Sequence, residues 1–273
     1  MKKIILILLV FSATQLSSFA QEKQKEKKKA KKESKAKNET AQDKILLRNL
    51  LKKGESYEQT MENESKIQIM GMEIQMTQVI TAKNVVTDVD AAGNLTQEST
   101  IEKFYMKQSN PMIGELEYDS ENTSKQSPEL AAQVGQIKGK KSILKITPTG
   151  QILEAPKEMS STVGSSGQFP QQAVGVGDTW EISSTTNNPM LNKEITSNNQ
   201  YKLIERTAGK AIIEINGKMV AEGKEIGSFS GKMTIEEATG ITLESDILQK
   251  LNMQMQGMES QVEGKIKIKG KKI

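Results

Sequence analysis

The sequence from Ile241 to Lys269, ITLESDILQKLNMQMQGMESQVEGKIKIK, decides the fold of this chain. Apolar residues occupy mostly odd positions in its first half and mostly even positions in its second half. Side chains alternate between the two faces of a strand, so each half has one apolar and one polar face. The change of phase at Gln256-Gly257 predicts a tight turn. We therefore expect Ile241–Gln256 and Met258–Lys269 to pair as an antiparallel hairpin.

The same two-residue period recurs from Tyr57 to Ile69 and, after a turn at Gly71, from Met72 to Met76. Short segments with Gly and other turn-forming residues separate the further extended stretches. They are Asp90–Asn94, Thr147–Gly150, Thr207–Lys210 and Glu237–Gly240. We therefore predict an all-β class with one helix, an antiparallel meander that forms an open or partly closed barrel.

One segment has the pattern of a helix. Ser127 suits the N-cap and Pro128 the first helical position. Apolar residues then recur on one helical face, at Leu130, Val134 and Ile137. We expect a helix from Pro128 to Lys138 against the concave face of the sheet, and a long loop from Ala155 to Gly177.

Composition divides the chain into three parts. Residues 1–20 combine two lysines, a short apolar run and small residues at Ser18 and Ala20, which is typical of a signal peptide. Residues 21–43 contain nine Lys and five acidic residues but no Val, Ile, Leu or aromatic residue, which predicts a disordered Lys-rich linker. Residues 44–273 have a length that suits a single antiparallel β domain. We expect export to the periplasm or the extracellular space, and no lipoprotein, because the signal lacks a cysteine.

The absence of His and Cys excludes several function classes. The chain cannot build a Ser-His-Asp triad, a Cys-His dyad or an HExxH zinc site. No pair of carboxylates stands out from the regular alternation along the strands. We therefore predict no enzyme, no cofactor and no metal site. The string Asp88, Asp90 and Asn94 lacks the spacing of an EF-hand and is interpreted as a hairpin turn.

Charge argues against a nucleic-acid partner. Residues 1–43 hold 11 Lys and five acidic residues, so residues 44–273 hold 27 basic and 29 acidic groups, a net charge of −2. This part has only two arginines, Arg48 and Arg206, and lacks the clustered basic and aromatic residues of nucleic-acid binders. The linker, with a net charge of +4, is either a solvated spacer or a weak tether to an anionic envelope surface. The apolar run of the signal is too short to span a bilayer, so we predict no integral membrane protein.

Methionine is the side chain that suggests a binding site. Met is flexible and polarizable, and Met-rich surfaces accommodate varied apolar ligands. The alternative is a core that uses Met as filler, and a third hypothesis, Cu(I) bound by thioethers, has no His or Cys to support it. If a ligand site exists, we expect it on the apolar face shared by several strands. Its predicted residues are Met61, Ile67, Ile69, Met72, Ile74, Met76, Met233, Leu251, Met253 and Met255.

Several short motifs resemble a known family. They are Leu51–Tyr57 (LKKGESY), Met70–Thr77, Val86–Asn94, Thr147–Gly150 (TPTG) and Val176–Trp180 (VGDTW). Together they resemble the exported bacterial proteins grouped as domain of unknown function 6263, over nearly all of residues 44–273. The resemblance implies a signal peptide, a β-rich domain and no recognised catalytic residue. In outline the predicted architecture is also similar to the half-barrels of periplasmic lipoprotein carriers.

These observations lead to one functional hypothesis and one alternative. The first is an exported, non-enzymatic binding protein that holds an apolar or amphipathic, lipid-like ligand in a half-barrel. The alternative is a structural or protein–protein interaction module at the cell envelope that has no ligand. A concave face with unfilled space favours the first, and a fully packed interior favours the second.

Overall fold

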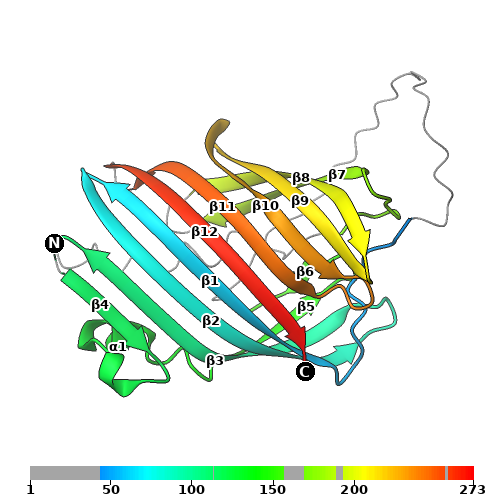
Figure 1. Ribbon diagram of the computed structural model, residues 1–273, viewed down its shortest axis with the longest axis horizontal. Coiled ribbons are helices and arrows are strands. Elements are labelled where there is room, and N and C mark those ends of the chain that lie inside the picture. Colours follow the sequence, from blue (N-terminus) through cyan, green and yellow to red (C-terminus); the bar gives the residue numbers. More distant parts are fainter. Residues whose placement is uncertain (1–43, 113, 157–168, 189–192, 256–257) are drawn as a thin grey trace.

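The residues that the computed structural model describes form one large antiparallel sheet and a single α-helix (Figure 1). It describes residues 44–112, 114–156, 169–188, 193–255 and 258–273. The strands are β1 Ser56–Ile69, β2 Met72–Val89, β3 Leu95–Asn110, β4 Gly114–Asp119, β5 Lys141–Ile146, β6 Ile152–Glu154, β7 Thr179–Asn188, β8 Lys193–Thr207, β9 Lys210–Ala221, β10 Lys224–Glu236, β11 Thr242–Met255 and β12 Met258–Lys272. The predicted signal peptide and linker lie outside the described residues.

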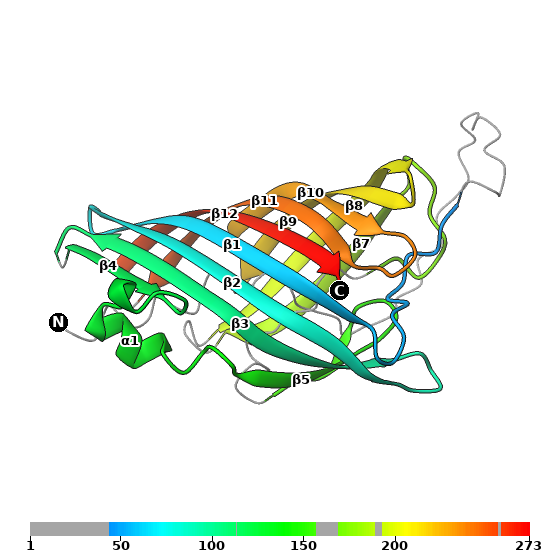
Figure 2. The same cartoon turned by 60° about the horizontal axis from the view of Figure 1, so that its bottom comes forward.

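The sheet curves strongly but does not close. Its strand order is β6-β5-β3-β2-β1-β12-β11-β10-β9-β8-β7, with β4 paired beside β5 on the edge of β3. The two edges of this path, β6 and β7, are not paired with each other. Figures 1 and 2 show the long strands running diagonally around a common interior. The predicted open half-barrel is therefore the observed architecture.

The hairpin of β11 and β12 has the expected register. Leu251 lies opposite Val262 and Ile247 opposite Ile266, so the apolar residues of both strands share the concave face. Charges alternate on the convex face, where Glu62 and Glu64 of β1 lie opposite Lys267 and Lys265 of β12. Opposite charges across neighbouring strands favour this register over a slipped one. The turn predicted at Gln256-Gly257 lies outside the described residues.

One end of the half-barrel is covered by two segments, residues 44–51 and 169–174. Ile45 and Val174 form an antiparallel bridge, and Phe169 donates its N–H to the carbonyl of Thr149 at 2.8 Å. The Arg48 guanidinium donates to the carbonyls of Pro170 and Gln171 at 2.6 and 2.8 Å. The β5–β6 turn and the N-terminal segment are thereby fastened together over this end. Of the predicted loop, residues 155–156 and 169–177 are described, and residues 169–174 form part of this cover.

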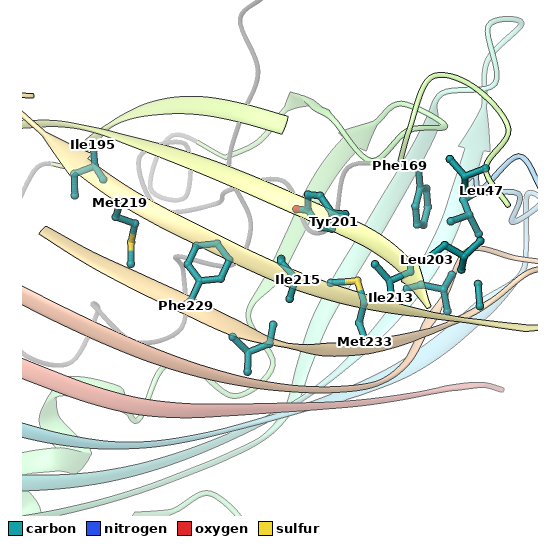
Figure 3. Packing of buried hydrophobic residues seen from close by; sticks show 14 of the residues in the cluster. Leu47, Phe169, Ile195, Tyr201, Leu203, Ile213, Ile215, Met219, Phe229 and Met233 are labelled. Atoms are coloured by element: carbon teal, nitrogen blue, oxygen red, sulfur yellow. The ribbon is translucent and has the colours of Figure 1, made fainter. Parts of the chain in front are cut away.

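The largest apolar cluster lies on the concave side of β8, β9 and β10, beneath this cover (Figure 3). Leu203, Ile213 and Ile215 project from neighbouring strands toward Leu47 and Phe169. The ring of Phe229 occupies the space beside Gly217, where an added Cβ would lie 2.2 Å from its Cζ atom. This part of the interior is filled by side chains, as in an ordinary core.

Helix α1, Pro128–Val134, covers the concave face at the other side of the sheet, beside β4 (Figure 2). Leu130 and Val134 are buried in a cluster with Phe104 and Met106, as the helical stripe predicts. The helix is shorter than the predicted 128–138, because it ends at a Gly135 cap. The Ser127 side chain does not cap it but accepts the N–H of Glu117 at 3.0 Å. A short 3₁₀ turn, Thr123–Lys125, precedes it and was not predicted.

Candidate functional site

The predicted ligand residues lie on strands β1, β2, β10 and β11, and the alternation directs most of them to the concave face. They do not form one lining, however. Those that belong to apolar clusters are divided among three separate clusters. Ile67, Ile69 and Ile74 form one cluster near the uncovered end. Met76 belongs to the cluster beneath helix α1. Met233 and Leu251 belong to the filled cluster of β8–β10. Met61 and Met72 are half-buried, and the side chains of Met253 and Met255 lie outside what the structure describes.

Between these clusters lies a set of polar side chains that each carry at least one buried atom without a hydrogen-bond partner. Seven buried side-chain N and O atoms have no hydrogen-bond partner in the part of the chain that the structure describes. Both polar atoms of Gln108 are among them, and its side chain is 1% exposed. We call this set the polar belt; its residues are Asn63, Ser65, Gln78, Gln108, Asn199 and Ser245. Each such atom costs roughly 1–3 kcal/mol, so a native fold usually avoids them.

The strand register brings the polar belt together. One transverse row of opposed residues crosses eight strands of the concave face, and it contains three belt residues. The row is Asn199, Gly217, Phe229, Gln249, Gly264, Ser65, Met76 and Gln108. The next inward-facing row includes Asn63 opposite Gln78, and the row after that includes Ser245. Residues that are diagonal to each other on neighbouring strands lie about 7–8 Å apart, which is within reach of long side chains such as those of Asn and Gln.

One glycine of the transverse row has room for an added carbon atom. An added Cβ at Gly264 would meet nothing closer than 3.7 Å, and its neighbours include Asn63 Oδ1 at 3.9 Å. This differs from Gly217 in the same row, whose place is taken by the Phe229 ring. The transverse row is therefore filled at Gly217, whereas at Gly264 an added carbon fits in van der Waals contact with its neighbours.

A second polar group on the concave face is, in contrast, satisfied within the chain. The Tyr57 hydroxyl donates to Gln97 Oε1 at 3.0 Å, and Gln97 Nε2 donates to Asn84 Oδ1 at 3.0 Å. Burial raises the pKa of Tyr57 to about 12, so its hydroxyl stays protonated and able to donate. The fold can thus pair buried amides with each other, and the polar belt is an exception to that behaviour.

The buried surface is also free of formal charge. Among the described residues, the buried polar side chains are all Asn, Gln, Ser or Thr. Carboxylates with a lowered pKa lie at the rims and turns instead. A hydrogen bond from Arg206 lowers the pKa of Glu237, and the side chain and N–H of Asn94 lower that of Asp90 to about 2. Asp90 accepts the N–H groups of Ala92 and Asn94, which confirms the predicted turn.

Each end of the half-barrel carries a surface hollow. At the covered end, a hollow of about 1080 Å³ is lined by residues that include Phe169, Asp178 and Trp180. Trp180 stacks on Tyr201 with ring centroids 5.4 Å apart, so this tryptophan is part of the inner lining as well as the hollow. At the uncovered end, a hollow of about 450 Å³ is lined by Ile226, Ser260 and neighbouring charged residues.

Sequence reasoning missed the polar belt. Asn63 and Ser65 share the inward phase of the Tyr57–Ile69 period, but neither they nor Gln78 were predicted as site residues. The available signal was an amide at an inward position in each of three segments, at Asn63, Gln78 and Gln108. That signal gains meaning only when the register places these residues side by side.

No protein family model matches this chain, and no curated protein matches it. The resemblance to domain of unknown function 6263 therefore stays a prediction. None of the described helices has the length and apolar character that a membrane span requires. Within the described residues there is also no group of three or more His, Cys, Asp or Glu side chains placed to hold a metal ion.

Proposed function

We propose that this chain is an exported, non-enzymatic binding protein that holds a lipid-like ligand against the concave face of its half-barrel. The single observation that carries the proposal is the polar belt, whose unpartnered atoms lie among buried apolar clusters. An apolar lining with a few placed polar groups is the usual composition of a small-molecule site. With one end covered, the opposite end would be the mouth through which a ligand enters.

The non-enzymatic part of the proposal has two supports. The chain contains neither His nor Cys, the side chains that most often act as general base or nucleophile. The carboxylates with a shifted pKa serve the architecture: Glu237 pairs with Arg206 at 2.7 Å, and Asp178 pairs with Lys44 at 3.1 Å. None of these groups belongs to the concave belt.

The location and partners follow from the sequence. The features of residues 1–20 support export, and the lysines of residues 21–43 support a spacer or a weak contact with an anionic surface. Nucleic acid is not a proposed partner of residues 44–273. Both arginines have structural roles there, because Arg48 bonds backbone carbonyls and Arg206 pairs with Glu237.

A structural or interaction module without a ligand is the second candidate. The observation that favours it is the filled cluster beneath β8–β10, where Phe229 occupies the space beside Gly217. In that case β7, the last strand in the described strand order, is where a partner strand would add to the sheet.

Native mass spectrometry of the protein purified from its own envelope separates the two candidates. We expect an adduct mass and a recovered lipid, and uptake of the uncharged fluorophore N-phenyl-1-naphthylamine. The variant Gly264→Leu should fill the space beside Asn63 and reduce uptake. Gln261→Leu, on the exposed face of the same strand, is the matched control. An unliganded mass with no fluorophore uptake contradicts the binding function and leaves the interaction module.

A further inference from the structure

Resting on this proposed function, we infer that the ligand carries an uncharged group that both donates and accepts hydrogen bonds, a hydroxyl or an amide, with hydrocarbon on either side. The polar belt is the site that would bind this group. The inference concerns the chemistry of the ligand, which the shape of the half-barrel does not define.

The belt offers both donors and acceptors. The unpartnered atoms include the Asn63 amide nitrogen, the Gln78 amide oxygen and both polar atoms of Gln108. The Ser65 hydroxyl can act in either sense. A hydroxyl or amide group satisfies both kinds, whereas an ether or ketone satisfies donors only. These four residues are each at least nine-tenths buried, so a partner must enter the concave face to reach them.

The belt also selects against charge. A buried carboxylate or phosphate needs a cation beside it, because an unpaired ion in apolar surroundings is strongly unfavourable. The described buried side chains include no Lys or Arg. The ion pairs of the described chain lie on the convex face and at the rims, as in Lys265 with Asp246 at 3.0 Å. An ionised ligand group would therefore stay at the mouth.

The position of the belt defines where the polar group lies along the ligand. Toward the uncovered end, the belt is followed by Ile67, Ile69 and Ile74. Toward the covered end, it is followed by the cluster that contains Val86, Leu95 and Ile241, beside which the polar atoms of Tyr57 and Gln97 are bonded to each other. A molecule that spans this face places hydrocarbon on both clusters and its polar group between them. We therefore expect a ligand whose polar group lies in the middle of the molecule and not at the end of a hydrocarbon chain.

Three probes of similar size test the inference by native mass spectrometry at pH 8. They are N-octyldecanamide, which has an internal amide, octadecanoate, which is charged at one end, and octadecane, which has no polar group. We expect the full mature protein to bind the amide about tenfold more tightly than either of the others, which corresponds to one or two satisfied hydrogen bonds. The double variant Gln78→Met and Gln108→Met should lose this preference while retaining octadecane, because Met has nearly the same shape as Gln. Gln68→Met, on the exposed face of β1, is the control.

The outcomes are distinct. Binding of none of the three probes contradicts the proposed function itself. Equal binding of all three, or preference for octadecanoate, leaves the function intact and overturns this inference. An unchanged preference in the double variant also overturns it. If that variant does not fold, as judged by its circular dichroism, the probe ranking of the unaltered protein decides the question alone.

Discussion

Asn63 of β1 and Gln78 of β2 are opposed register partners on the concave face, and each carries an amide atom that no described residue satisfies. Two amides opposite each other on neighbouring strands are close enough to interact. Both are nonetheless left with an unmet donor or acceptor at 1% and 5% exposure. This pair is the centre of the polar belt.

Substitutions in the two polar groups of the concave face should have opposite effects on the free energy of unfolding. Gln108→Met removes two unpartnered atoms, so we expect the free energy of unfolding to stay unchanged or to rise by about 1 kcal/mol. Gln97→Met leaves Asn84 and the Tyr57 hydroxyl without their partner, and should cost about 1–3 kcal/mol. Urea unfolding of both variants measures the difference. Equal destabilisation by the two substitutions would show that Gln108 is satisfied in solution.

The two glycines of the transverse row should also differ in how well they tolerate substitution by alanine. Gly217→Ala places a Cβ against the Phe229 ring and should cost about 1–3 kcal/mol by overpacking. Gly264→Ala meets no atom closer than 3.7 Å and should be tolerated. Thermal unfolding of the two variants compares them. Adding Phe229→Leu to Gly217→Ala should recover part of the loss, since it removes the clash; a purely additive double variant would argue against this account.

Helix α1 should depend on its buried stripe for attachment to the sheet. Leu130 is fully buried among Phe104, Met106 and Tyr118, so Leu130→Ala should lower the free energy of unfolding by about 2–5 kcal/mol. Gln133→Ala on the exposed side of the helix should change it by less than about 0.5 kcal/mol. Chemical denaturation is again the measurement. A small effect of Leu130→Ala would mean that the helix is not firmly packed on the concave face.

The Asp90 turn predicts a pH dependence. Its pKa falls from 3.8 to about 2 in the folded chain, chiefly through hydrogen bonds from Asn94. The ionised Asp90 carboxylate therefore makes its full contribution to the stability of the fold above about pH 4, and this contribution is lost as the pH falls through about 2. Asp90→Asn should be less stable than the unaltered protein at pH 7, and the two melting temperatures should converge near pH 2. If the difference between the two melting temperatures stays constant from pH 7 to pH 2, the ionised Asp90 carboxylate does not stabilise the fold.

The charge distribution predicts no retention on DNA or heparin resin by a chain that starts at Lys44. Its net charge is −2, and Arg48 and Arg206 are both engaged in structural bonds. The full mature protein is the informative comparison at moderate salt, because counterion release by the linker lysines is strongly salt-dependent. Retention of the full mature protein alone would indicate that residues 21–43 act as a tether. Retention of the shorter chain would contradict the charge argument.

Much of the fold could be predicted from local pattern. The two-residue period from Ile241 to Lys269 predicted the β11–β12 hairpin, and its convex charges and concave apolar residues agree with the observed register. The apolar stripe from Leu130 predicted helix α1, but not its end at Gly135, where the C-terminal cap competes with the continuing apolar pattern. The local pattern predicts these strands correctly because each strand must bury one face, whichever strands it pairs with.

The sequence by itself therefore determined the class of the protein: an antiparallel β domain with alternating faces, no His or Cys chemistry, and a mildly acidic composition after residue 43. Only the tertiary structure decided which inward residues meet. The predicted lining residues that belong to apolar clusters fall into three separate ones, and the polar belt is assembled from β1, β2, β3, β8 and β11. The physical reason is that alternation along a strand gives only the face of each side chain, whereas strand order, register and bulges define its neighbours across the sheet.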